Sequence, residues 1–331
     1  MMSVVETPEM IKEKRIMLVA MLLNVFSCMC LFMNVASLLP TFVLENHTPP
    51  LNDTYVGILM AVFPIGFLLA APLIGQYMEV IGRKNILYIG VFMMTLATLT
   101  FGLASYATNA WMFYGISTFA RFFQGIANAS INVTTPSITA QEFPKQKTIY
   151  LGYCNMALGL GCAIGPVLGS LVYTLCQSYV QTFYFFTAFI FVVGTVCVSF
   201  VPSRINKKAA GLVLVPATEN IPAVANPYRQ SITYFTILRN RRALSTIIMC
   251  VYAMTASQVV VPVLSVRLTT PPFNMSDAGA GYAFGLMGGA QALGAPFAGW
   301  MGTQMPIKWV SQIGCCALIF AFFFSGPSLY F

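Results

Sequence analysis

The sequence predicts an all-α, polytopic membrane protein, and three observations lead to that prediction. The 331 residues are 58% hydrophobic and only 8% charged, whereas a soluble domain carries roughly a quarter charged residues. The apolar residues gather in long runs, and a run of about 20 residues is enough to cross a bilayer as a helix. These runs are too long and too evenly apolar for the alternating strands of a membrane β-barrel.

The apolar runs divide the chain into an expected series of membrane spans. We expect them over Ile16–Val43, Tyr55–Met78, Ile86–Tyr106, Trp111–Thr134, Ile149–Leu175, Phe183–Val201, Ala243–Leu264, Gly279–Met301 and Trp309–Phe331. The longest polar segment separates the sixth span from the seventh. We therefore expect a six-helix bundle over residues 1–201, a cytoplasmic linker over 202–242 and a partial second bundle of three helices over 243–331.

Basic residues predict the topology of these spans. Most of the 17 Lys and Arg residues precede the first span or follow an even-numbered one, and positive charge beside spans stays on the cytoplasmic side. We expect a cytoplasmic N-terminus, in the plasma membrane or an intracellular vesicle. The net charge of +8 then reports topology, and we expect no nucleic-acid partner. Three glycosylation sequons agree, because they fall in turns assigned to the outside: Asn46, Asn52 and Asn274.

An internal repeat relates the two bundles. One register aligns Asp53 with Asp277 and Lys84 with Lys308. The same register aligns the segment that begins Ala71-Pro72 with the one that begins Ala295-Pro296. The second span therefore corresponds to the eighth, with the same direction across the membrane. Parallel repeats of this kind place a substrate site between the two halves of a secondary transporter.

A short charged turn joins the second and third spans. It contains Gly75, Glu79, Gly82, Arg83 and Lys84. The Glu79 carboxylate can pair with Arg83, or lie against a helix N-terminus of the other half, where the helix dipole favours negative charge. We interpret the turn as a gating latch. The alternative is a solvated hairpin whose charges only set the topology.

Polar residues inside spans indicate either a cavity or helix–helix contacts, because lipid offers them no partner. Arg121 is the single charge deep within a span, where it costs at least about 2.5 kcal/mol on insertion scales. For Arg121 we predict proton coupling or substrate contact, with a purely structural role as the alternative. The other candidates for the cavity are polar residues of spans one, four and seven: Asn24, Asn34, Gln124, Asn128, Asn132, Tyr252 and Gln258.

Glycines recur at four-residue steps in the fifth span. Gly161, Gly165 and Gly169 form this ridge, and Pro166 lies within it. Small residues at such a spacing let a neighbouring helix approach closely. We expect a tight helix pair that limits leakage through the bundle, and plain helix packing would use the same contacts.

Three of these segments resemble signatures of the major facilitator superfamily, whose members have twelve helices in two halves. The turn follows the loop signature Gly-x-x-x-Asp-Arg-x-Gly-Arg-Arg/Lys, with Glu79 and Val80 in place of Asp and Arg. Arg121 and Gln124-Gly125 are similar to the Arg-x-x-Gln-Gly signature. The glycine ridge is similar to the Gly-Pro motif of the antiporter branch, and residues 72–77 and 142–144 resemble the vesicular amine and polyamine transporters.

The resemblance implies a secondary transporter of which about nine of the twelve helices are present, so that the chain is C-terminally incomplete. We expect a monomer in a lipid bilayer that exchanges protons for a small organic cation by alternating access. No P-loop, metal cluster or catalytic triad occurs in the sequence, so we expect no enzymatic activity, no cofactor and no metal. Two alternatives stay open: a non-transporting membrane sensor or scaffold, and a facilitative uniporter of neutral solutes.

Overall fold

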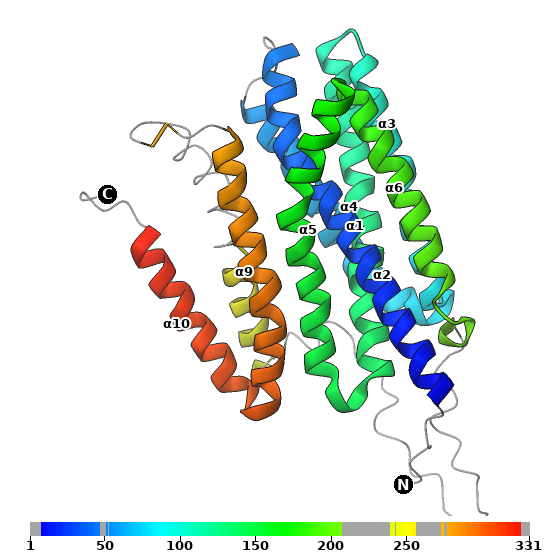
Figure 1. Ribbon diagram of the computed structural model, residues 1–331, viewed down its shortest axis with the longest axis vertical. Helices are drawn as coiled ribbons and strands as arrows, with labels where there is room; N and C mark the ends of the chain where they lie inside the picture. Colours follow the sequence, from blue (N-terminus) through cyan, green and yellow to red (C-terminus); the bar gives the residue numbers. More distant parts are fainter. Residues whose placement is uncertain are drawn as a thin grey trace, which may run out of the picture. The chain divides into compact units, whose positions relative to one another are not determined.

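The computed structural model describes residues 8–46, 51, 53–206, 239–241, 243–255, 273–274 and 277–325, and the regular structure of these residues is helical (Figure 1). The long helices are α1 (Pro8–Asn46), α2 (Asp53–Ile81), α3 (Arg83–Leu103), α4 (Ala110–Glu142), α5 (Lys147–Cys176), α6 (Tyr179–Ser199), α9 (Asp277–Gln304) and α10 (Ile307–Ser325). Residues 243–255 form a further helix. Three 3-10 turns are η1 (Ala104–Tyr106), η2 (Pro144–Gln146) and η3 (Ser203–Asn206). The all-α class is thereby confirmed.

The helices α1 to α6 follow the first six predicted spans in order and extend past them at most ends. Within the described residues, five helical segments are long and apolar enough to cross a membrane, and they belong to α1, α2, α3, α5 and α6. The helix α4 continues beyond the predicted end at Thr134 to Glu142. A helix satisfies its own backbone hydrogen bonds on either side of the hydrocarbon core, so its end need not coincide with the end of an apolar run.

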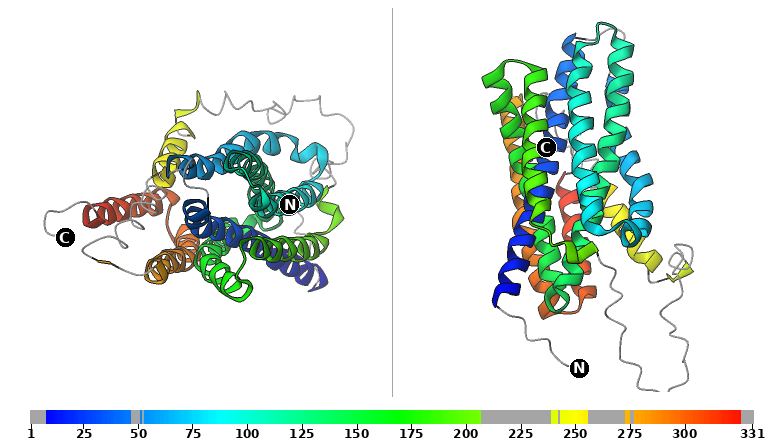
Figure 2. Two further views of the ribbon diagram at one scale, coloured as in Figure 1. Left: turned by 90° about the horizontal axis from the view of Figure 1, so that it is seen from above. Right: turned by 90° about the vertical axis from the view of Figure 1, so that its right-hand side faces the viewer.

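The helices α1 to α6 pack side by side (Figure 2), and α1 and α4 each contact most of the others. The helix α4 packs against α1, α2, α3 and α5, while α1 also packs against α5 and α6. This position explains why α4 carries so many small and polar residues: its side chains meet other helices over most of its circumference. It is also the helix that brings Arg121 into the bundle.

The described helices fall into two compact units. The helix α9 groups with α1 to α6 in one unit, whereas α10 and the helix over residues 243–255 belong to the other. The predicted boundaries at residues 201 and 242 concern the two halves of a transporter, and they stay a prediction.

Candidate functional site

Arg121 lies in the interior of the first bundle, and its side chain is fully buried (0% exposed). Its guanidinium donates to Gln124 Oε1 at 3.1 Å and lies 3.8 Å from the sulfur of Met60 on α2. It also lies over two aromatic rings, 4.7 Å from the centre of Phe63 and 5.7 Å from that of Phe32. The negative faces of these rings attract a cation, by roughly 2 kcal/mol or more when it is desolvated. Arg121 is thus held between α1, α2 and α4.

The hydrogen bond to Gln124 continues as a chain to α3. Gln124 Nε2 lies 3.3 Å from Thr98 Oγ1, and Thr98 donates to the carbonyl oxygen of Met94 at 2.7 Å. Gln124 and Thr98 are both fully buried. The chain fixes which end of the Gln124 amide faces Arg121, so a change at Thr98 would also be felt at the guanidinium.

Three buried polar atoms near Arg121 have no hydrogen-bond partner among the described residues. They are Arg121 Nε, the hydroxyl of Ser117 one turn earlier on α4, and the hydroxyl of Tyr179 on α6. Tyr179 lies within electrostatic range of the guanidinium. In the described part of the chain no carboxylate forms an ion pair with Arg121. Among the described residues, the guanidinium thus keeps an unused donor and has the two ring faces, but no carboxylate, beside its charge.

Replacing Tyr179 by Phe is expected to keep or raise the free energy of unfolding, by up to about 2 kcal/mol, because a buried hydroxyl without a partner costs desolvation energy. Thermal unfolding of the detergent-solubilised protein measures the change. Tyr173→Phe, at a side chain that is 40% exposed, serves as the control. A clear loss of stability in Tyr179→Phe alone would contradict the assignment of this hydroxyl as unpaired.

The rest of the polar face of α4 packs within the bundle. Asn128 is buried, and Asn132 donates to its side-chain oxygen at 2.6 Å. Gly125 lies against the backbone of Phe63 on α2, where a Cβ would meet the carbonyl oxygen. The glycine of the Arg-x-x-Gln-Gly segment is therefore required for close packing of α2 and α4, and that packing places Phe63 beneath Arg121.

The polar stripe of α1 lies at contacts with other helices. Asn24, Ser27 and Asn34 are all buried, with 1% or less of each side chain exposed. Asn24 lies 3.4 Å from the position of a Cβ at Gly194 on α6, and Asn34 contacts Gly169, the last glycine of the ridge predicted in span five. The structure thus places Asn24 against α6 and Asn34 against α5.

The predicted glycine ridge of α5 packs against α1. A Cβ at Gly161 would lie 2.5 Å from that of Met29, and a Cβ at Gly165 would lie 2.7 Å from the carbonyl oxygen of Cys30. Contacts as short as these leave no room for any side chain. Pro166 lies inside the helix and is only partly buried. The ridge is therefore a contact within the first bundle.

Replacing Gly165 by Leu is expected to lower the free energy of unfolding by about 3 kcal/mol or more, because overpacking here displaces the backbone of α1 at Cys30 and not merely a flexible side chain. Thermal unfolding and the yield of folded protein measure the loss. Gly115→Leu is the matched control, since a Cβ at Gly115 meets nothing within 4 Å. Equal stability of the two variants would contradict the close contact.

A second glycine stripe on α5, which the sequence did not suggest, faces α9 within the same compact unit. A Cβ at Gly159 would lie 2.5 Å from the backbone nitrogen of Ala292, and a Cβ at Gly288 would lie 2.5 Å from that of Ala163. The contact is reciprocal, with a small residue from each helix against the backbone of the other. It extends along the helices through Gly152 with Ala295 and Gly299 with Thr148. We call this contact the α5–α9 seam.

The charged turn between α2 and α3 carries a weak ion pair. Glu79 and Arg83 lie 3.9 Å apart, and the Glu79 side chain is 68% exposed. Exposed pairs of this kind contribute at most about 1 kcal/mol. Lys84 lies 5.8 Å from the centre of the Tyr88 ring, and Gly75 falls inside α2, before the turn.

Four charged residues that the sequence analysis did not single out meet near this turn. Glu142, at the end of α4, pairs with Arg204 of η3 at 3.3 Å and with Lys14 of α1 at 3.8 Å. Arg204 also lies 3.8 Å from Glu13. Only 15% of the Glu142 side chain is exposed, so this carboxylate joins the ends of three elements in a partly dry environment. The partners in each pair are far apart in the chain, so no local pattern in the sequence predicted these ion pairs.

The remaining predicted residues belong to the second compact unit or have positions or side chains that the structure does not describe. Tyr252 is exposed on the helix over residues 243–255, whereas Gln258 is not among the described residues. Asn274 is exposed and has a positive φ of 44°. Asn52, and the side chain of Asn46 at the end of α1, also fall outside the described residues. Their predicted roles stay predictions.

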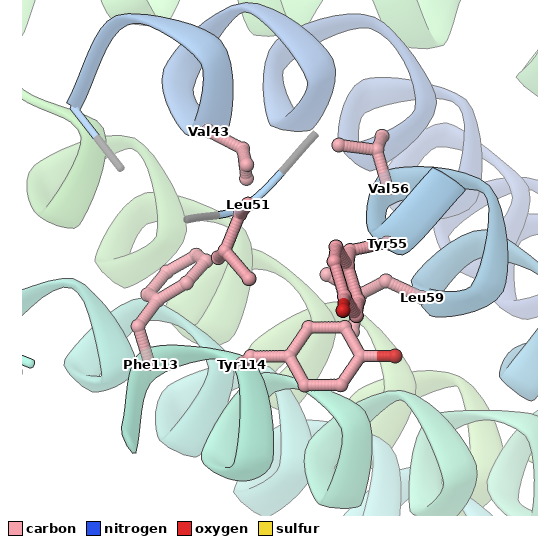
Figure 3. Close-up of a pocket in the computed structure, with 7 residues that line it drawn as sticks. All are labelled: Val43, Leu51, Tyr55, Val56, Leu59, Phe113 and Tyr114. Carbon is pink, nitrogen blue, oxygen red and sulfur yellow. The ribbon is translucent and has the colours of Figure 1, made fainter. Parts of the chain in front are cut away.

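A small apolar pocket lies between the first residues of α2 and α4 and the last turns of α1 (Figure 3). Its interior leaves no room even for a water molecule, whereas typical ligand pockets hold 300 Å³ or more. The surface of the pocket is wholly apolar, and the residues that line it are Val43, Leu51, Tyr55, Val56, Leu59, Phe113 and Tyr114. We assign it to the packing of Leu51, because none of the predicted site residues reaches it.

Comparison with known proteins decides the family. The profile of the Major Facilitator Superfamily matches residues 14–331, which is nearly the whole chain. The chain belongs to the Major Facilitator Superfamily. As a member of this superfamily it is an integral, multi-pass membrane protein of a transporter family, and the predicted fold is confirmed.

Relatives within the superfamily carry transporter and resistance names. Multidrug resistance protein 2 of Bacillus subtilis is 28% identical over 49% of this chain and 38% of its own length. The class H tetracycline resistance protein of Pasteurella multocida is 32% identical over 41% and 31%. The human MFS-type transporter SLC18B1 is 27% identical over 60% and 41%. These matches thus span less than half of each relative's length.

Proposed function

We propose that the chain acts as a secondary active transporter, which exchanges protons for a small organic cation by alternating access. The observation that carries the proposal is the pair of glycine stripes on α5. One stripe fixes α5 to α1 through Gly165, and the other places α5 against α9 through Gly159 and Gly288. Because α9 corresponds to α2 in the internal repeat, the seam joins the two sequence halves.

The α5–α9 seam suits a contact that must open and close. Small residues bring two backbones together through van der Waals packing and without long interlocking side chains. Separating such surfaces therefore strips few rotamer-locked contacts from either helix. The α1–α5 ridge is a different case, because buried Asn34 and Cys30 lie against it. We infer that α5 moves with α1, and that motion occurs at the seam.

Proton coupling is proposed from the state of Arg121. A fully buried guanidinium with one unused donor and no carboxylate partner in the described residues favours a negative charge near it. Such a cation stabilises the deprotonated form of any carboxyl group that approaches. The preference for a cation follows from the resemblance to amine and polyamine transporters, and relatives named for multidrug and tetracycline resistance support a small organic substrate. A cytoplasmic N-terminus and a monomeric state complete the proposal.

Uptake by proteoliposomes that contain the purified chain tests the proposal. Tetraethylammonium is a suitable probe because its fixed charge prevents trapping by protonation. We expect tetraethylammonium to accumulate against its own concentration gradient only while a pH gradient, acidic inside, is imposed. Accumulation should stop after nigericin collapses the pH gradient. Uptake of mannitol that ignores the gradient would favour a uniporter instead. Absence of uptake for tetraethylammonium, tetracycline and mannitol would favour the sensor or scaffold.

A further inference from the structure

The helix α3 begins at a residue that cannot cap it. Its N-cap is Gly82, which has a φ of 96° and forms no side-chain capping bond. A helix start leaves several backbone N–H groups without partners, and an N-cap side chain normally accepts from the second or third of them. The second N–H of α3 belongs to Lys84, inside the charged turn. The cap for this group has to come from elsewhere in the chain.

Asn206, the last residue of η3, supplies it. The backbone N–H of Lys84 donates to Asn206 Oδ1 at 2.8 Å. This is the bond that an Asn at position 82 would make, although Asn206 lies 122 residues after Lys84 in the chain. The absence of a side chain at Gly82 makes it possible, since a Cβ there would lie 2.7 Å from Asn206 Oδ1. Gly82 is thus required both for its positive φ and for the space that Asn206 fills.

The Asn206 amide also reaches the end of α2. Its Nδ2 donates to Asn85 Oδ1 at 2.9 Å, and Asn85 Nδ2 donates to the carbonyl oxygen of Ile81 at 2.9 Å. The orientation of both amides is fixed, because the first bond has a backbone N–H as its donor and the last has a backbone carbonyl as its acceptor. One side chain therefore holds the start of α3 directly and the last turn of α2 through Asn85.

The turn η3 is itself anchored to the first bundle. Arg204 pairs with Glu142 of α4 at 3.3 Å and lies 3.8 Å from Glu13 of α1. Ile205, between Arg204 and Asn206, packs against the hydrophobic core. Asn206 thus approaches the α2–α3 turn from a fixed platform, which lowers the entropy cost of the remote cap.

We propose that Asn206 is the positioning residue of the α2–α3 turn. It acts as the N-cap of α3 from across the fold and sets the geometry of Arg83 and Lys84 in the gating latch. The proposal rests on the proposed function for the latch role of the turn, but not for the cap itself. Through Asn206 and Arg204, the residues that follow α6 are tied to α1, α3 and α4 at one end of the bundle.

Hydrogen exchange followed by mass spectrometry on the full chain tests the cap without any transport assay. In Asn206→Ala we expect the amides at the start of α3, Lys84 first among them, to exchange about tenfold faster, which is the scale of a lost N-cap. Asn206→Asp keeps the oxygen that accepts from Lys84 but loses the donor to Asn85, so it is expected to restore slow exchange at Lys84 in part. Ser203→Ala, an exposed position of the same turn, is the matched control and should exchange like the wild type.

Two results would overturn the proposal: unchanged exchange at Lys84 in Asn206→Ala, or faster exchange at Lys84 that Asp does not slow at all. If Asn206→Ala does not fold, Asn85→Ala gives a second test, because it removes the bond from Asn206 to Asn85 but leaves the acceptor for Lys84, so exchange at Lys84 should stay slow. Tetraethylammonium uptake adds a separate readout, in which a lower maximal rate at constant KM, rescued by Asp, is expected. If the wild-type protein shows no uptake, the transport proposal is wrong. The hydrogen-exchange result still tests the cap independently.

Discussion

Arg121→Lys is expected to lower proton-driven uptake at least about tenfold while the protein stays folded. Lys keeps the charge but is a compact point charge, so it cannot bond Gln124 in the same geometry or lie flat over the Phe63 ring. The lost charge-assisted hydrogen bond is worth roughly 1.5–3 kcal/mol, and 1.36 kcal/mol in a barrier is tenfold in rate. Initial rates of tetraethylammonium uptake in proteoliposomes measure the effect.

The control for this prediction is Arg15→Lys, the same change at an exposed residue of α1. Uptake by this variant should stay within twofold of the wild type. Thermal unfolding of both variants separates a transport defect from a folding defect. Wild-type uptake in Arg121→Lys would show that charge alone suffices and would remove the geometric role of the guanidinium.

Gly288→Leu is expected to abolish most uptake, by about tenfold or more, because it prevents α5 and α9 from closing. A Cβ at Gly288 already lies 2.5 Å from the backbone nitrogen of Ala163 and 2.9 Å from its Cα. These atoms are backbone and cannot rotate away, so the larger side chain must push the helices apart. The contacts that hold α1 to α6 together do not involve Gly288, and the first bundle should therefore keep its stability.

The adjacent glycine provides a close control. A Cβ at Gly289 meets nothing within 4 Å, so Gly289→Leu makes the same chemical change one residue further along α9 without a clash. Its uptake should stay within about twofold of the wild type. If Gly288→Leu and Gly289→Leu transported equally well, the α5–α9 seam would not be part of the transport cycle.

Local patterns predicted the helices and the motifs, but not the partners of the motifs. Apolar runs of membrane length predicted α1 to α6, because backbone groups in lipid must bond within their own helix. The glycine spacing at 161, 165 and 169 predicted a close contact, and α1 proved to be the helix that makes it. A repeat of small residues shows that some backbone comes near. It does not say which one.

The sequence by itself determined that this protein is an all-helical membrane protein of a transporter family. The apolar runs and the three short motifs that show this are patterns of residues close together in the chain. Only the tertiary structure decided how those motifs are supported. It enclosed Arg121 between Phe32 and Phe63, set the Gly159 stripe against α9, and brought Asn206 to the uncapped start of α3. Each of these contacts joins residues far apart in the chain, so no local pattern specifies them, and packing of the helices alone brings them together.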